Sequence, residues 1–115
     1  MKYDILALVG QHCMTPEDGQ KVYALVHPEL LAGNPVELDF AGVDIFASPF
    51  FNFAIGQLLR DIPPESLNRL LIFSNLNLVG KQILKRVIEN SKQYYSDESF
   101  RKTVDAVVSE QASTL

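Results

Sequence analysis

The stretch VELDFAGVDIFASPFFNFAIGQLLRD, residues 36–61, decides the fold because it changes from a strand pattern to a helix pattern. Apolar and acidic side chains alternate over residues 36–40, which predicts a strand with one buried face. Residues 41–46 follow as a turn that can briefly extend the sheet. The run at residues 49–60 then repeats apolar residues at helical spacing. Ser48 stands just before this helix, where it can either cap the helix or carry a regulatory phosphate.

Strand and helix patterns alternate on both sides of this stretch. The short apolar runs DILALV at residues 4–9 and RLLIFSN at residues 69–75 are typical of buried strands. The patterns at residues 15–26 and 75–95 are typical of helices. Parallel strands joined by right-handed helical crossovers explain this order. We therefore expect a single α/β domain, with a central, mostly parallel sheet of about four strands flanked by helices.

Capping residues and prolines predict where the helices begin and end. Thr15 is expected to cap the first long helix, and Pro28 to kink or end it near His27. The proline pair at residues 63–64 is expected to stop the helix at 49–60. Asn75 or Asn77 is expected to cap the last helix. The expected core-facing residues of the two long helices are Val22, Leu25, Val26, Val79, Ile83, Val87 and Ile88.

The chemistry of the chain changes near residue 95. Residues 1–95 carry the α/β patterns, whereas residues 96–115 are polar and keep only a narrow apolar stripe. We therefore expect a C-terminal helical extension with a frayed end over residues 96–115. The stripe consists of Phe100, Val104, Val107 and Val108.

The length and net charge of the chain limit the classes of function that it can have. A chain of 115 residues is long enough for one domain with one core. A formal net charge of −4 argues against nucleic acid as a partner, because phosphate binding needs a concentrated basic surface. Cys13 is the only cysteine, which suits a reducing compartment. The apolar runs are too short for a signal peptide or a membrane span, so a soluble, cytoplasmic protein is expected.

The helix at residues 49–60 has two different faces. Its expected core side consists of Phe50, Phe51, Ala54, Ile55 and Leu58. Phe53 falls on the opposite, otherwise polar side, together with Asn52, Gly56 and Arg60. The C-terminal helix can cover Phe53, or a partner protein can bind there. In the second case the expected partner-binding residues are Asp44, Ser48, Asn52, Phe53 and Gly56.

Catalytic and metal sites are not expected. His12, Cys13 and His27 lack the spacing of a metal-binding set, and Ser48 lacks the glycines of a nucleophile elbow. We therefore expect a non-enzymatic protein without a metal or cofactor. The rival prediction is a small-molecule site in the crevice at the carboxyl ends of the strands. That crevice would be lined by Gly10, Gln11, His12, Phe40, Ser74 and Asn75.

Three segments carry a resemblance to a known family. EDGQKVYALV, VELDFAGVDIFASPFFNFAIGQLL and LLIFSNLNLVGKQILKRVIENSK, within residues 17–92, resemble the STAS-like family of small bacterial domains. This family is related in fold to the anti-sigma-factor antagonists. The resemblance implies a sheet flanked by helices, a bacterial cytoplasmic setting and a role in regulation through protein–protein contacts.

The resemblance also gives Ser48 a specific role. In the antagonist branch, a serine or threonine at the start of the corresponding helix is phosphorylated by a partner kinase, and Ser48 is the matching position. Antagonists usually carry an acidic residue, two hydroxyl residues and a glycine there, whereas this chain reads ASPF at residues 47–50. The STAS-like branch is therefore the better match. The implied partner is an anti-sigma-type kinase or a related ATPase, and a homodimer is the alternative assembly.

Overall fold

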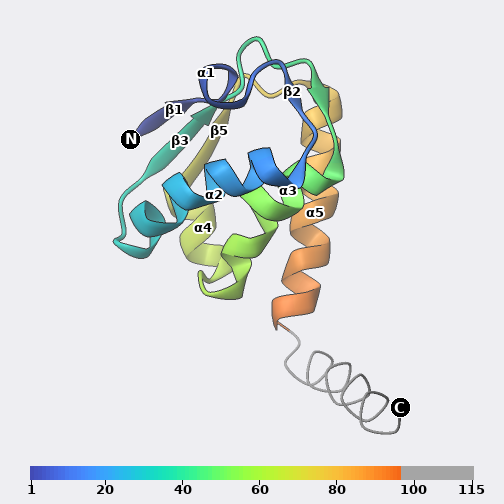
Figure 1. Ribbon diagram of the computed structural model, residues 1–115. Helices are drawn as coiled ribbons and strands as arrows, with labels where there is room; N and C mark the ends of the chain where they lie inside the picture. Colours follow the sequence, from blue (N-terminus) through green and yellow to red (C-terminus); the bar gives the residue numbers. More distant parts are fainter. Residues whose placement is uncertain (97–115) are drawn as a thin grey trace, which may run out of the picture.

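The structure, a computed structural model, describes residues 1–96 as an α/β arrangement (Figure 1). The strands are β1 (Lys2–Asp4), β2 (His12–Cys13), β3 (Val36–Asp39), β4 (Ile45–Phe46) and β5 (Leu71–Ser74). The helices are α1 (Ile5–Val9), α2 (Pro16–Leu31), α3 (Ser48–Ala54), the 3-10 helix η1 (Gly56–Arg60), α4 (Pro64–Leu70) and α5 (Leu78–Ser96). The expected C-terminal extension falls almost entirely on residues 97–115, outside the described residues.

The described strands form two parallel sheets, which confirms the predicted α/β class. Three strands make the main sheet in the order β1-β3-β5, and β2 pairs with β4 in a second sheet of two. The expected count of about four strands in one sheet is therefore only approximate. The segment at residues 41–46 does not extend the main sheet, because its strand pairs with β2 instead.

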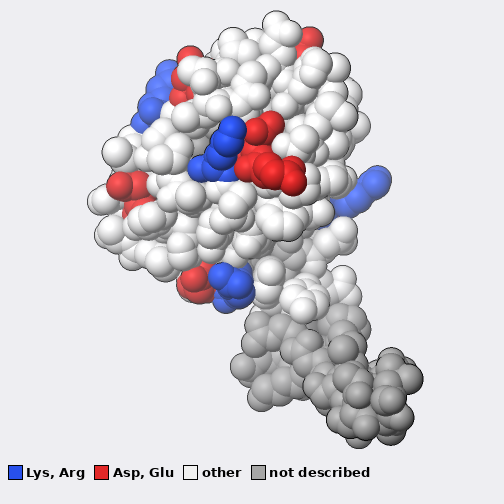
Figure 2. All heavy atoms as spheres, viewed as in Figure 1, with Lys and Arg blue, Asp and Glu red and all other residues white. Residues whose placement is uncertain are grey.

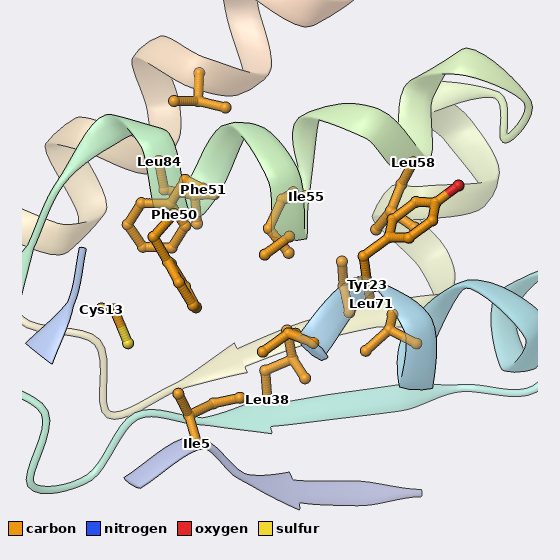
Figure 3. Packing of buried hydrophobic residues seen from close by; sticks show 14 of the residues in the cluster. Ile5, Cys13, Tyr23, Leu38, Phe50, Phe51, Ile55, Leu58, Leu71 and Leu84 are labelled. Atoms are coloured by element: carbon orange, nitrogen blue, oxygen red, sulfur yellow. The ribbon is translucent and has the colours of Figure 1, made fainter. Parts of the chain in front are cut away.

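The main sheet has one buried face. The alternation predicted for residues 36–40 is confirmed, since Val36, Leu38 and Phe40 are buried. The helices α2 and α3 lie over this face, and Figure 3 shows side chains of α3 and η1 pointing toward Leu38 and Leu71. On the opposite face, Lys2 of β1 forms ion pairs with acidic residues of β3, at N–O distances of 3.7 and 3.8 Å.

The predicted strand at residues 4–9 is wrong, because only its first residue belongs to a strand. The Asp4 carboxylate accepts a hydrogen bond from the Ala7 N–H at 3.3 Å, which caps α1 immediately after β1. Gly10, with φ of 90°, ends this single turn. Five apolar residues are too few for periodicity to separate a strand from a short helix.

The helix α2 begins as predicted and ends later. The Thr15 hydroxyl accepts from the Asp18 N–H at 3.1 Å, which confirms Thr15 as the cap. Pro28 does not end the helix near His27, because α2 continues through it to Leu31. Burial of Leu30 and a hydrogen bond from the Ala32 N–H to the Pro28 carbonyl hold this last turn.

The prolines at residues 63–64 both end one helix and start another. They terminate η1 as predicted, but Pro64 also occupies the first turn of α4, a helix that the sequence analysis missed. The strand β5 consequently starts at Leu71, two residues later than expected.

The last helix is capped by one of the two predicted asparagines. The Asn77 side chain accepts from the Gly80 N–H at 2.8 Å, whereas Asn75 has a left-handed φ of 56° before the helix. The predicted stripe needs correction, because Val79 is exposed and Leu84 is buried instead. No helix within residues 1–96 is long and apolar enough to cross a membrane.

Candidate functional site

The two-stranded sheet brings the starts of α2 and α3 together. The strand β2 pairs in parallel with β4, and the Ala47 N–H extends the pairing with a 2.9 Å hydrogen bond to the Cys13 carbonyl. Each strand leads within three residues into its helix, so the two helices start at the same edge and run side by side (Figure 1). Gly19 permits this approach, because a Cβ atom there would overlap the Phe50 carbonyl oxygen.

Ser48 lies open to solvent at the start of α3, but it does not cap the helix. Ala47 is the N-cap residue, with an extended φ of −139° and ψ of 152°, and no side chain caps this helix. Ser48 is already the first helical residue. The prediction that Ser48 acts as the cap is therefore wrong, and capping does not explain why a serine stands here.

Phe53 lies on the outward side of α3, as predicted, with 41% of its surface exposed. Its Cβ atom borders Gly19 of α2, and its carbonyl accepts from the Gln57 side chain at 2.9 Å. The same amide group donates to the Gln20 side chain at 3.1 Å and so ties η1 to α2. Asn52 is exposed beside Phe53. The part of the backbone that carries the Phe53 ring is therefore held against α2.

Gly56 is not on this exposed face, contrary to prediction. The helix predicted at residues 49–60 breaks at Ile55, where α3 ends and the tighter η1 follows. The break changes the angular phase, and Gly56 is buried against α5. A Cβ atom on Gly56 would lie 2.7 Å from the Ser91 hydroxyl. Gly56 therefore lies at the contact between η1 and α5.

Asp44 is exposed, but it lies on the far side of β4 from Ser48. Its backbone carbonyl accepts from the Asn77 side chain at 3.4 Å, which places it beside the start of α5. Of the five predicted partner-binding residues, Ser48, Asn52 and Phe53 are therefore the ones that are exposed on α3.

The sequence analysis missed two exposed apolar residues in the segments that lead into α2 and α3. Met14 follows β2 and Ile45 belongs to β4, and they are 44% and 43% exposed. Because side chains alternate along paired strands, both point away from the buried pair Cys13 and Phe46. We call the set Met14, Ile45, Ser48, Asn52 and Phe53 the α3-start surface. Alternation within such short strands was the only sequence signal for the two additions.

The charged side chains on the face that presents α2 and α3 lie in separate groups. Figure 2 shows a mixed group of acidic and basic side chains near the N-terminal half of α2, with uncharged surface around it and further charged groups toward the edges of the view. Within this region Lys21 pairs with Asp18 at 3.6 Å. Such a surface suits contacts with uncharged side chains better than contacts with phosphates.

The candidate catalytic residues do not assemble. His12 is exposed and Cys13 is buried, so the two neighbours point in opposite directions. Burial and the nearby Asp18 carboxylate raise the pKa of Cys13 to about 12, which keeps it protonated. His27 stacks on Tyr23 and its Nε2 atom lies 2.9 Å from the Asp61 carboxylate. Within residues 1–96 no group of three His, Cys, Asp or Glu side chains could hold a metal ion.

The carboxyl edge of the main sheet is closed by its own side chains. Asp39 accepts from the Ala41 N–H at 3.0 Å and from the Asn75 side chain at 2.9 Å, and Ser74 donates to Glu37 at 2.8 Å. The Asn75 hydrogen bond, followed by the Ala41 one, lowers the pKa of Asp39. Leu6 of α1 packs on the nearby turn at Gly42. Of the residues expected to line a small-molecule crevice, Phe40 is buried and both Ser74 and Asn75 are engaged.

The parallel sheets with helices packed on them define a domain of the STAS-like type. Residues 18–81 match the family described as STAS-like domain of unknown function (DUF4325), and the chain belongs to this family. The match includes α3 and most of the α3-start surface, while β1, α1 and β2 precede it. No curated protein and no solved structure was found to match the chain.

Proposed function

We propose that this protein is a non-enzymatic regulatory module that binds a protein partner through the α3-start surface. The observation that carries the proposal is the exposed Ser48 hydroxyl, which has no capping role and begins a helix that, with the two strands leading into α2 and α3, exposes the apolar side chains Met14, Ile45 and Phe53. A side chain that does not stabilise the fold is available for contact with a partner protein.

The composition of the surface supports a protein as the partner. Aromatic residues and methionine are enriched in the centres of protein–protein interfaces, and charged residues are depleted there. The backbone at Phe53 already packs against α2, so partner binding does not have to order this part of the backbone. Burying a fully exposed aromatic side chain contributes about 1.5–3 kcal/mol, and covering the 41% of Phe53 that is exposed contributes a part of this. Phe53 is therefore the expected centre of the interface, with Ser48 and Asn52 beside it.

Phosphorylation of Ser48 is the proposed switch. A phosphate adds a charge of about −1.5 to −2 in the middle of an apolar contact surface, which opposes the burial of that surface. Pro49 lacks an N–H group and α3 has only seven residues, so the helix start offers few donors to the phosphate. The modification is therefore expected to weaken partner binding and to leave the fold nearly unchanged.

The proposed partner class follows from the family relationship. We propose an anti-sigma-type kinase or a related ATPase as the partner, in a bacterial cytoplasm, with a homodimer as the alternative assembly. A homodimer would bury the same surface of two copies against each other. Size measurements on the isolated protein separate the two, because only the homodimer forms without a second protein.

Affinity capture from the native cell tests the proposal. The immobilised parent protein is compared with Ser48→Ala and Ser48→Asp, and the bound proteins and any phosphate on the bait are identified by mass spectrometry. Ser48→Ala is expected to retain the partner and Ser48→Asp to lose it, with equal melting temperatures. Leu31→Ala is the control for an exposed apolar residue, because Leu31 lies at the far end of α2. Equal capture by all variants would contradict the switch.

A further inference from the structure

A second surface of the molecule shares no residue with the α3-start surface. A groove of about 470 Å³ opens between β5 and α5, and Asn68 of α4 lies at its border. Its apolar lining comes from both sides, with Phe73 and Leu76 in and after β5, and Leu84 and Ile88 on α5. The groove is therefore a feature of the main sheet and the last described helix.

The outer edge of β5 carries backbone groups that no other described residue pairs with. Within the part of the chain that the structure describes, β5 has a neighbour on one side only, which is β3. Across this pairing the Ser74 carbonyl accepts the Phe40 N–H at 2.9 Å. Because backbone groups of successive strand residues point to opposite sides, the Phe73 N–H and carbonyl face away from β3. Such an edge is a template for one more strand.

The helix α5 does not close this edge. It packs against α3, η1 and β4 rather than along β5. Phe73 and Ile88, which line the groove from opposite sides, are accordingly only half-buried. Unpaired backbone groups and partly covered apolar side chains therefore border the same groove.

The charged residues that line the groove are mostly basic. Three of the four are lysines, at positions 81, 85 and 92, and the fourth is Glu89. Lys81 and Lys85 are exposed, and neither forms an ion pair with another residue of the range 1–96. The whole chain has a formal net charge of −4, so this basic lining is a local feature. It favours an acidic occupant.

We propose that the groove binds an extended acidic segment of a protein partner, which adds a strand to the main sheet at the outer edge of β5. The backbone of the segment pairs with that of Phe73, and its apolar side chains enter the groove beside Ile88. Its carboxylates interact with Lys81 and Lys85. The inference goes beyond the proposed partner-binding function and does not depend on it.

Two other occupants fit the groove less well. A helix cannot pair with the edge of β5, because its own backbone groups are already hydrogen-bonded within the helix. A second copy of this chain, joined edge to edge through β5, would bring the same excess of lysines against the first. An acidic strand satisfies both the backbone groups and the charges.

Binding of a synthetic peptide to the full-length protein tests the proposal. The four residues of β5 span about 13 Å, so a peptide of about seven residues with blocked ends covers the strand. The probe alternates valine with glutamate, and its binding is followed by fluorescence anisotropy. It is expected to bind at least about tenfold more tightly than the same peptide with lysine in place of glutamate. Equal affinities, or no binding of the glutamate peptide, would overturn the proposal.

Methylated peptides separate strand addition from other modes of binding. Alternate N–H groups of an extended peptide point to the same side, so either the valine or the glutamate N–H groups face β5. Methylation of one set is expected to weaken binding at least about tenfold, and methylation of the other set to change it by less than about twofold. Equal effects of the two methylations would overturn the strand pairing.

A matched pair of substitutions on α5 checks the location. Lys85→Gln is expected to weaken binding of the glutamate peptide by about two- to fivefold, the range for the loss of one exposed ion pair. Arg86→Gln is the control, because Arg86 is also exposed on α5 but does not line the groove. Equal weakening by the two variants would indicate attraction to the net charge of the helix and would overturn the assignment of the groove.

Discussion

The two parallel sheets of this protein end in different ways. At the carboxyl edge of the main sheet, Asp39, Ser74 and Asn75 are hydrogen-bonded to neighbours within the fold. At the corresponding edge of the β2-β4 sheet, Ser48 and Phe53 are exposed and no side chain caps α3. This difference indicates which sheet edge can bind a partner, because polar groups that hold the fold together are not free to do so. The small sheet, rather than the larger one, therefore carries the candidate site.

The strongest contrast within the small sheet is between Cys13 and its neighbour Met14. Cys13 is fully buried with a pKa of about 12, against an ordinary value of 9.0, whereas Met14 is exposed. At pH 8 the thiolate population, and hence the rate of labelling by a thiol reagent, is expected to be about a thousandfold below that of an unperturbed cysteine. If the thiol reagent labelled Cys13 in the native protein as fast as in urea, the core beneath the α3-start surface would be open to solvent.

The next contrast lies within α3 itself. Phe51 is fully buried, with ring centroids 5.6 Å from Phe46 and 5.3 Å from Phe50. Phe51→Ala is expected to lower the free energy of unfolding by about 3–5 kcal/mol, because it leaves a cavity in the core. Urea denaturation followed by circular dichroism measures this loss. If Phe51→Ala changed the free energy of unfolding as little as the substitution of an exposed residue, the assignment of the buried and exposed faces of α3 would be wrong.

Gly19 tests whether α2 must approach α3 closely. Gly19→Ala would gain up to about 1 kcal/mol from helix propensity alone. A net loss of about 2 kcal/mol is expected instead, since the new Cβ atom meets the backbone of Phe50 and forces the helices apart. Lys21→Ala, at an exposed position of the same helix, is the control and should change stability little, because its ion pair with Asp18 is exposed. A stabilised Gly19→Ala variant would contradict the close packing beneath Phe53.

The smallest effect is expected at the closed edge of the main sheet. The folded-state pKa of Asp39 is lowered, so its contribution to stability is present above its ordinary value of 3.8 and is lost as the pH falls through the folded-state value. Between pH 6 and pH 3, the parent protein should therefore lose slightly more stability than Asp39→Asn. Urea midpoints at the two pH values provide the comparison. If the stability of the parent protein and that of Asp39→Asn depended on pH in the same way, the Asp39 carboxylate would not stabilise this edge of the sheet.

Local sequence signals predicted much of the fold. The alternation at residues 36–40, the Thr15 cap and the outward position of Phe53 each depend on a few neighbouring residues, and all three are present. The family resemblance rested on the same local patterns. The Asn77 cap was one of two alternatives, and the structure selects it.

The failures have causes outside the local pattern. Gly56 was placed on the wrong face because contact with Ser91, thirty-five residues later, accompanies a break in the helix that periodicity assumes to be regular. Ser48 was assigned the cap because it is the better capping residue, yet the backbone of Ala47 takes that position. Of the candidate site, Ser48, Asn52 and Phe53 could be predicted. Met14 and Ile45 could not, because their exposure depends on the pairing of β2 with β4.

Phe53→Ala provides the most direct test of the claim that the outer side of α3 is a binding surface. The account predicts that this variant captures at least about tenfold less partner than the parent protein, while its free energy of unfolding stays within about 1 kcal/mol. Capture at the parent level, together with a loss of several kcal/mol in stability, would show that the ring belongs to the core and contradict the claim.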